Sequence, residues 1–260
     1  MNTSGTTLDR PRRLFRFFNP PGAEFLQNRR LWFRRICDLN DPFDGVPALG
    51  TMVRRAKSYW TNQMLRDGFL TNESHAELER RSKEAEDKVH ENFSIGARSL
   101  FAIVSFTASL NRIPFWSYYA QDHKGFAVEF NPRHKFFDKL VRVEYTNHRP
   151  PIRGIDDADS RLFDLIRTKS KDWEDEDEWR LPAMLQNLTE DNGPEGTGFT
   201  HYLKVPAEAI RAVFLGCRAD STLTTRIGSI LKHRKLCKIR CFEMKPDLDY
   251  YKLNPVPVIW

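Results

Sequence analysis

One short acidic run carries the side chains best suited to chemistry in this chain. Residues 174–178 are all Asp or Glu, and the run continues into Trp179, Arg180 and Leu181. Strand alternation places Glu178 and Arg180 on one face and the apolar pair on the other. A carboxylate on a rigid strand can stabilise positive charge in a reaction, so we expect Glu178 to face a cleft without contributing to core packing. The alternative is an exposed ion pair on an edge strand.

Composition indicates a folded globular protein. The chain has 260 residues, of which 40% are hydrophobic and 29% charged, and its mean hydropathy is −0.59. The sequence contains no run of about 20 apolar residues, so we expect no membrane partner, and the polar N-terminus does not resemble a secretory signal. Four cysteines are too few for a disulfide scaffold, which fits a reduced, cytoplasmic compartment. Cys237 and Cys241 are predicted to be buried thiols.

Positive charge is concentrated near the N-terminus. The net charge is +6, and eight arginines lie between residues 10 and 35, interleaved with Phe15, Phe17, Phe18, Trp32 and Phe33. Basic and aromatic side chains together are typical of polyanion-binding surfaces. The alternative is a pair of strands with aromatic core faces and solvated arginines.

The pattern of apolar residues predicts an α+β fold. We expect a disordered leader over residues 1–13 and a single domain over 14–260 with a mixed, largely antiparallel sheet. Strands are predicted at 14–18, 30–33, 101–107, 125–130, 141–145, 179–185, 202–205, 212–215 and 238–244. Helices are predicted at 73–97, 159–172 and 223–234, and the Gly-, Pro- and Asn-rich segment 189–198 is expected to be a mobile loop.

Several motifs follow one another in a recognisable order. They are Leu14–Phe17, Leu31–Phe33, Asn40–Asp44, Ser105–Thr107, Phe115–Ala120, Gly125–Phe130, Val143–Tyr145, Lys169 and Glu176–Leu181. The series resembles a bacterial family known only as domain of unknown function twenty-nine seventy-one. The resemblance extends from Leu14 to about Phe242, and the family name implies no function.

The order of these motifs is also similar to that of ADP-ribosyltransferases. Those enzymes carry a His or Arg on the first strand, a Tyr or Ser on a central element, and a Glu near the end, often as Glu-x-Glu. Arg16 matches the first position, Tyr119 the second with Ser117 as the alternative, and Glu178 the third with Glu176 as the upstream acid. This resemblance implies an ADP-ribosyltransferase-like split sheet.

The same resemblance implies transfer of ADP-ribose from NAD to a macromolecule, or hydrolysis of NAD. NAD would then be a substrate bound by Arg16, Trp116, Ser117 and Tyr119, with no metal. Cleavage of the nicotinamide bond builds positive charge on the ribose, which a carboxylate such as Glu178 can stabilise. The basic charge makes nucleic acid a candidate acceptor, and a defence or toxin system fits such an activity.

Two other classes of function fit the same residues. A metal-dependent nuclease could use Asp172, Glu174, Glu176 and Glu178 as oxygen ligands, with Lys169 nearby. A module that binds nucleic acid or nucleotide without catalysis is the third hypothesis.

Overall fold

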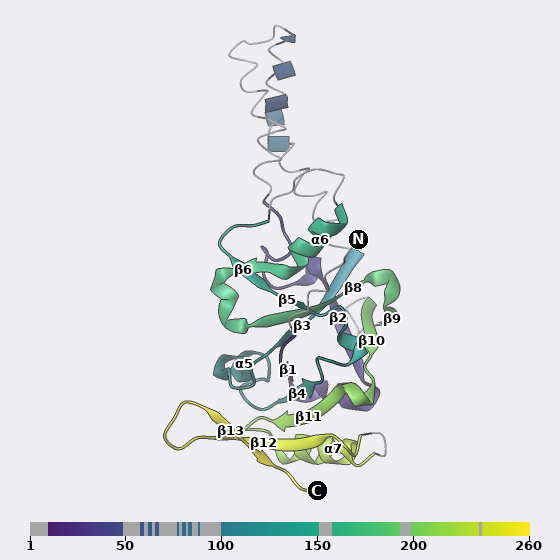
Figure 1. Cartoon of the computed structure of the whole chain (residues 1–260), viewed down its shortest axis with the longest axis vertical. Helices are drawn as coiled ribbons and strands as arrows, with labels where there is room; N and C mark the ends of the chain where they lie inside the picture. Colours follow the sequence, from purple (N-terminus) through teal and green to yellow (C-terminus); the bar gives the residue numbers. More distant parts are fainter. Residues whose placement is uncertain are drawn as a thin grey trace, which may run out of the picture.

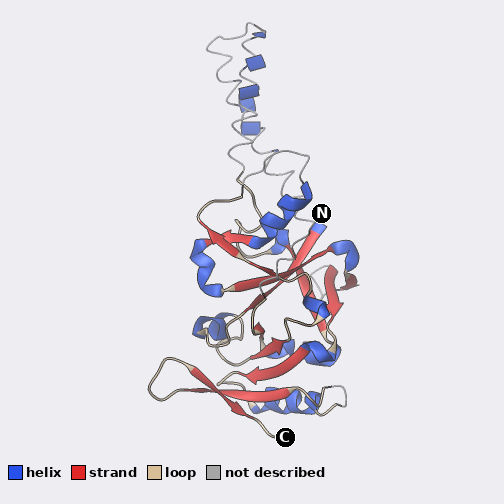
Figure 2. Ribbon diagram, viewed as in Figure 1, coloured by secondary structure: helices blue, strands red, loops and turns tan. Residues whose placement is uncertain are grey.

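A mixed, largely antiparallel sheet forms the body of this computed structural model (Figure 1; Figure 2). The structure describes residues 10–48, 100–150, 158–192, 199–233 and 236–260, with scattered positions between 58 and 88. The main order of strands is β13 (Leu253–Pro257), β12 (Arg240–Pro246), β11 (Ile210–Leu215), β4 (Phe126–Phe130), β1 (Leu14–Phe18), β3 (Phe101–Thr107), β2 (Arg30–Arg35), β10 (Phe199–Lys204) and β9 (Thr189–Asn192). In addition, β8 (Glu178–Met184) pairs with β3 and with β5 (Val141–Arg142), while β6 (Glu144–Thr146) and β7 (Thr168–Ser170) form a separate parallel pair.

The sheet splits beside the strand β3. One edge of β3 pairs with β8 along its whole length. The other edge meets β1 through Phe15, opposite Thr107, and meets β2 through Arg34 and Arg35. Because β1 and β2 occupy opposite ends of this edge, they diverge and leave a gap beside Ser105.

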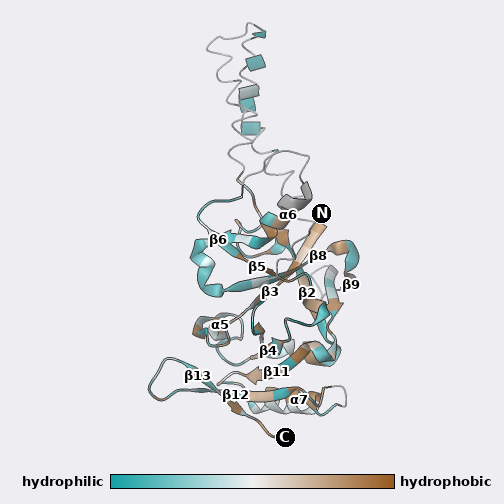
Figure 3. Cartoon of the chain, viewed as in Figure 1, coloured by the Kyte–Doolittle hydropathy of each residue, from teal (hydrophilic) through white to brown (hydrophobic). Residues whose placement is uncertain are grey.

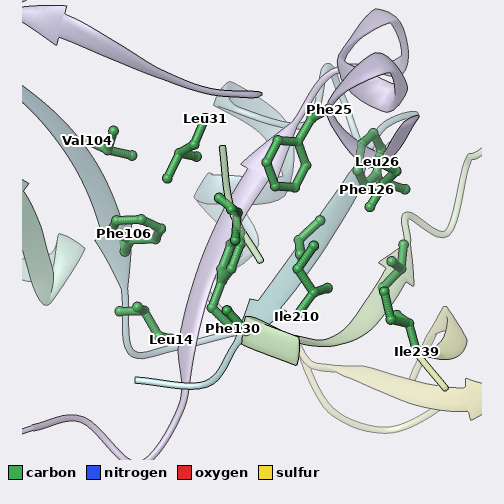
Figure 4. Close-up of a cluster of buried hydrophobic side chains, with 14 of the residues drawn as sticks. Leu14, Phe25, Leu26, Leu31, Val104, Phe106, Phe126, Phe130, Ile210 and Ile239 are labelled. Carbon is green, nitrogen blue, oxygen red and sulfur yellow. The ribbon is translucent and has the colours of Figure 1, made fainter. Parts of the chain in front are cut away.

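Hydrophobic side chains cover both faces of the central strands. Figure 4 shows the larger cluster, in which Val104 and Phe106 of β3 lie near Leu14 of β1 and Phe130 of β4. A second cluster on the opposite face contains Phe15, whose ring lies edge-on to Phe214 at 5.9 Å. These alternating side chains explain the strand predictions, since successive residues of a strand point to opposite faces.

Short helices flank the sheet. They are α1 (Glu24–Asn28), α5 (Ile113–Tyr118), α6 (Ala158–Arg167) and α7 (Ser221–Leu231). Asp220 caps α7 by accepting a hydrogen bond of 2.7 Å from the Leu223 amide. Figure 1 shows α7 alongside β12, close to one end of the sheet. The last strand at this end is β13, which contains Pro255 and Pro257.

A strained turn connects α5 to β4. Gln121, Asp122 and His123 have φ values of 47°, 54° and 67°, the left-handed region that non-glycine residues rarely adopt. Gly125 follows, and a Cβ at that position would lie 2.0 Å from a backbone oxygen of Phe18. This packing fixes the end of α5, and with it the neighbouring Tyr119.

Most predicted strands are present, with four differences. The strand predicted over 141–145 is divided into β5, which pairs with β8, and β6, which pairs with β7 in the separate sheet. The helix predicted over 159–172 ends at Arg167, because the next three residues form β7 and pair with β6. Residues 189–192 of the predicted mobile loop form β9, which pairs with β10, and residues 193–198 lie outside the described part of the chain. Cys237 is exposed, whereas Cys241 is buried as expected.

Two predictions fall largely on residues that the structure does not describe. Residues 1–9 of the predicted leader are outside it, while Arg10 contacts the Pro132 carbonyl and Asp138. The predicted helix 73–97 is described only at positions 77, 80, 81, 83, 84 and 88, all of which are helical. Among the described residues, no helix combines the length and apolar character needed to cross a membrane.

Candidate functional site

A cleft opens where the sheet splits between β1 and β2. Its volume is about 220 Å³, smaller than the roughly 300–1,000 Å³ of pockets for drug-sized ligands, so it suits one small group of a larger molecule. The charged and hydroxyl groups that line it include Arg16, Arg34, Tyr119, Lys169, Glu176 and Glu178. The structure therefore brings together the four residues predicted to be catalytic, Arg16, Tyr119, Glu176 and Glu178, from β1, the end of α5, and the segment entering β8.

Glu178 lies in the floor of this cleft, and ion pairs surround its carboxylate. Glu178 and Arg180 share one face of β8, as predicted, but they are only 3% and 1% exposed. Oε1 accepts a hydrogen bond from Nε of Arg180 at 2.8 Å, and Oε2 accepts one from Nζ of Lys169 at 2.9 Å. The exposed ion pair on an edge strand is therefore ruled out. The expectation that Glu178 contributes nothing to packing is also wrong, because it belongs to a buried network.

The charges around Glu178 keep it ionised. Burial by itself raises the pKa of Glu178, but the neighbouring Arg180 and Lys169 outweigh burial and bring the pKa to about 2. Arg180 is shared with Asp44, whose two oxygens bind its guanidinium at 2.8 and 2.6 Å. Burial raises the pKa of Asp44 in spite of the opposing charge of Arg180.

Glu176 is the more accessible carboxylate of the cleft. It belongs to the 3₁₀ helix η5 (Lys171–Glu176), a hydrophilic segment in Figure 3. The Tyr119 hydroxyl donates a hydrogen bond of 2.8 Å to Oε1 of Glu176, and Nζ of Lys169 binds Oε2. Burial, followed by the charge of Glu176, raises the pKa of Tyr119, so Tyr119 stays protonated and remains a donor at neutral pH. Lys169 thus bridges Glu176 and Glu178.

Two arginines place unbalanced positive charge on the cleft wall. Nη1 of Arg16 on β1 donates to the Ser105 carbonyl of β3 at 2.8 Å, at the gap between β1 and β2. Burial and the nearby charge of Arg34 lower the pKa of Arg16 to about 10. Among the described residues, neither arginine has an acidic partner, whereas Glu176 and Glu178 each bind a cation. This wall is therefore suited to binding an anionic group.

Two predicted ligand contacts are not supported by the structure. Trp116 is fully buried, where its indole Nε1 donates to the Leu110 carbonyl at 2.9 Å. Ser117 lies 3.4 Å from Nε2 of His123 and does not line the cleft. Neither residue lines the cleft, so their predicted contacts with NAD gain no support from the structure. The helical repeat is the reason, because Phe115 and Tyr119, four residues apart, share the face of α5 that meets the cleft.

Three of the four carboxylates assigned to a metal by the nuclease hypothesis have other partners. The Lys169 ammonium lies between Glu176 and Glu178, the position that a bridging cation would need. Asp172 accepts a hydrogen bond of 2.9 Å from the Ser170 hydroxyl. In the described part of the chain, no three His, Cys, Asp or Glu side chains are arranged to hold a metal ion.

Comparison with known proteins adds no relative. No protein-family model matches the chain, and no curated protein and no solved structure matches it either. The resemblances to the family of unknown function and to ADP-ribosyltransferases therefore stay predictions that rest on the sequence motifs.

Sequence reasoning missed two residues of the cleft. Asp44 belongs to the Asn40–Asp44 motif, yet no role follows from that motif without its contact to Arg180. Arg34 is one of eight arginines between residues 10 and 35, and its residue type alone does not distinguish it from the others. Alternation along β2 was the available signal, because the neighbouring Phe33 is buried and Arg34 must then face the opposite side.

Proposed function

We propose that this cleft binds NAD and cleaves its nicotinamide–ribose bond, so that the protein is an ADP-ribosyltransferase-like enzyme. One observation carries the proposal: Arg16, Tyr119, Glu176 and Glu178, chosen from the sequence by motif order, line one cleft at a split in a largely antiparallel sheet. Residues so far apart in sequence have no local reason to converge. The ADP-ribosyltransferase-like fold is part of the proposal.

The charge distribution supports specific roles. Arg16 and Arg34 bind the diphosphate, because they are the cations of the cleft without an acidic partner among the described residues. Tyr119 provides an aromatic ring beside Phe115, at a centroid distance of 5.3 Å, against which nicotinamide can pack. The small volume fits this division, with the nicotinamide end inside the cleft, the diphosphate at its arginine wall and the adenosine outside.

The two carboxylates have different tasks in this proposal. When the glycosidic bond breaks, nicotinamide leaves with the electron pair and positive charge develops on the ribose. Glu176, held by Tyr119 and Lys169, is the acid that contacts the ribose. Glu178 is only 3% exposed and is bound by Arg180 and Lys169, so it stabilises the charge from a distance and positions Lys169. A nucleophilic acceptor or water then bonds to the anomeric carbon and loses its proton.

Nicotinamide release from NAD, followed by chromatography, tests the proposal. Glu176→Gln keeps the shape of the side chain but removes its charge, and we expect turnover to fall about 100-fold, the scale of losing one electrostatic contact to a transition state. Glu174→Gln is the matched control, since Glu174 is an exposed acid of the same 3₁₀ helix. EDTA should leave the activity intact.

Two results would overturn the proposal. One is the absence of nicotinamide release together with the absence of any melting-temperature shift with NAD or ADP-ribose. The other is cleavage of nucleic acid that needs no NAD and stops with EDTA, which would favour the nuclease hypothesis.

A further inference from the structure

Basic and aromatic side chains continue from the cleft across the same face of the sheet. On β2, alternation places Arg30, Trp32 and Arg34 on the face opposite the buried Leu31 and Phe33. Arg34 lines the cleft, so this face of β2 leads directly into it.

The neighbouring strand β10 extends this face. Tyr202 pairs with Trp32 across the two strands, and Lys204 pairs with Arg30. We call these five residues, Arg30, Trp32, Arg34, Tyr202 and Lys204, the β2–β10 surface. Figure 1 shows β2 and β10 side by side, with β3 next to β2.

The aromatic pair is arranged to accept a flat ring. The Trp32 ring is edge-on to Tyr202, with centroids 5.2 Å apart and an interplanar angle of 70°. Trp32 is 38% exposed although tryptophan is usually buried, so part of its indole is free to contact a ligand. The Arg30 guanidinium lies over the Tyr202 ring, 4.8 Å from its centroid.

The charge of the surface selects an anionic partner. Arg30 is paired with Asp191, which neutralises it locally. Among the described residues, Lys204 and Arg34 have no acidic partner, so the surface carries excess positive charge beside its aromatic rings. This combination is the one that single-stranded nucleic acids require, because their phosphates bind cations and their unpaired bases stack on aromatic side chains.

We infer that the β2–β10 surface binds single-stranded nucleic acid and directs it toward the cleft at Arg34. The bound nucleic acid is then the acceptor of ADP-ribose in the transfer reaction. This acceptor role rests on the proposed function, whereas the binding itself does not. A duplex fits less well, since its bases are stacked on each other and unavailable to Trp32.

Fluorescence anisotropy with a labelled oligothymidine of about 15 nucleotides tests the binding without NAD. Trp32→Ala should weaken binding about fivefold or more, because stacking of one base is lost, while Trp32→Phe should retain most of the affinity. Lys204→Glu should weaken binding and reduce its dependence on salt between about 50 and 200 mM, because one phosphate contact disappears.

Matched controls lie elsewhere on the surface. Tyr251→Ala removes a fully exposed aromatic residue from the β12–β13 hairpin, and Lys139→Glu reverses an exposed charge outside the β2–β10 surface. Both should leave the affinity unchanged, and circular dichroism should show that Trp32→Ala is folded.

The inference is overturned by any of three outcomes: no binding at low salt, equal binding by the folded Trp32→Ala variant, or equal binding of duplex DNA or an acidic polypeptide. These outcomes are separable from those of the NAD assay. Nucleic-acid binding without NAD cleavage keeps this inference and refutes the proposed function, whereas NAD cleavage with unchanged binding by folded Trp32→Ala does the reverse.

Discussion

Asp44 binds the guanidinium of Arg180 with both carboxylate oxygens, at 2.8 and 2.6 Å, although the two residues are 136 positions apart in the sequence. This contact anchors the segment after β2 to the middle of β8. Arg180 in turn binds Glu178, so one guanidinium joins two acids beneath the cleft. The segment around Asp44 and the floor of the cleft therefore depend on each other.

Asp44→Ala should reduce the free energy of unfolding by about 3 kcal/mol, because it leaves a buried guanidinium with one acid instead of two. Urea denaturation followed by circular dichroism measures the change. Asp38→Ala provides the control, since its ion pair with Arg35 is exposed and its removal should cost less than about 1 kcal/mol. Equal effects of the two substitutions would show that the Asp44–Arg180 contact is not a buried pair in solution.

Glu178→Gln should also destabilise the fold, by about 3 kcal/mol at neutral pH, because Arg180 and Lys169 lose their shared counter-charge. The pKa of Glu178 is about 2 in the fold and 4.5 ordinarily, so the unfolded state binds the proton first as the pH falls. The stabilisation is therefore complete above about pH 4.5 and disappears as the pH falls toward 2.

Comparing the wild type with Glu178→Gln across this range isolates the contribution of one group. The raised pKa of Asp44 makes its contribution to the free energy of unfolding change with pH in the opposite direction. Because Asp44 is present in both proteins, its contribution cancels in the comparison. The two stability curves should converge between pH 4.5 and 2. A difference that stays constant down to pH 2 would contradict the low pKa.

Arg34→Ala should leave the free protein at least as stable as the wild type, because it relieves repulsion with Arg16. The same substitution should reduce the increase in melting temperature caused by ADP-ribose, since one of two anion-binding cations is lost. Arg35→Ala is the neighbouring control, since Arg35 is occupied by Asp38. The anion-binding role fails if both variants respond to ADP-ribose like the wild type.

Tyr119→Phe should reduce NAD turnover about tenfold or more with little loss of stability. The hydroxyl makes a charge-assisted bond to Glu176, a contact of about 1.5–3 kcal/mol, while the ring is 45% exposed. Tyr118→Phe is the adjacent control, because Tyr118 is 80% exposed and lies outside the cleft. Steady-state kinetics on both variants distinguishes the role of Tyr119 from a general effect on α5.

Periodicity was enough to predict the fold class and most strands. Trp179 and Leu181 alternate with Glu178 and Arg180, and the structure confirms both faces. The strand β9 was missed because the polar residues 189–192 have no apolar alternation, and pairing with β10 supplies the order that their own sequence does not.

The candidate site was less accessible to sequence reasoning. Its central contact depends on Asp44, whose partner is far away in the sequence, and no local pattern indicates which acid of a charged chain is buried. Trp116 was predicted to bind NAD, but its large apolar ring is buried against Phe17. Tyr119 was selected by motif order, and the structure places it in the cleft with Glu176 and Glu178.

The prolines of β13 have a consequence for how the sheet ends. The Val258 amide donates to the Cys241 carbonyl of β12, so alternate amides, including those of positions 255 and 257, would point outward. Both positions are proline, which has no N–H to offer. At the opposite end, β9 carries Glu190 and Asp191, whose charges repel a second copy of the same strand. The β13 and β9 edges therefore each disfavour pairing with another chain, the device by which sheet proteins resist edge-to-edge aggregation.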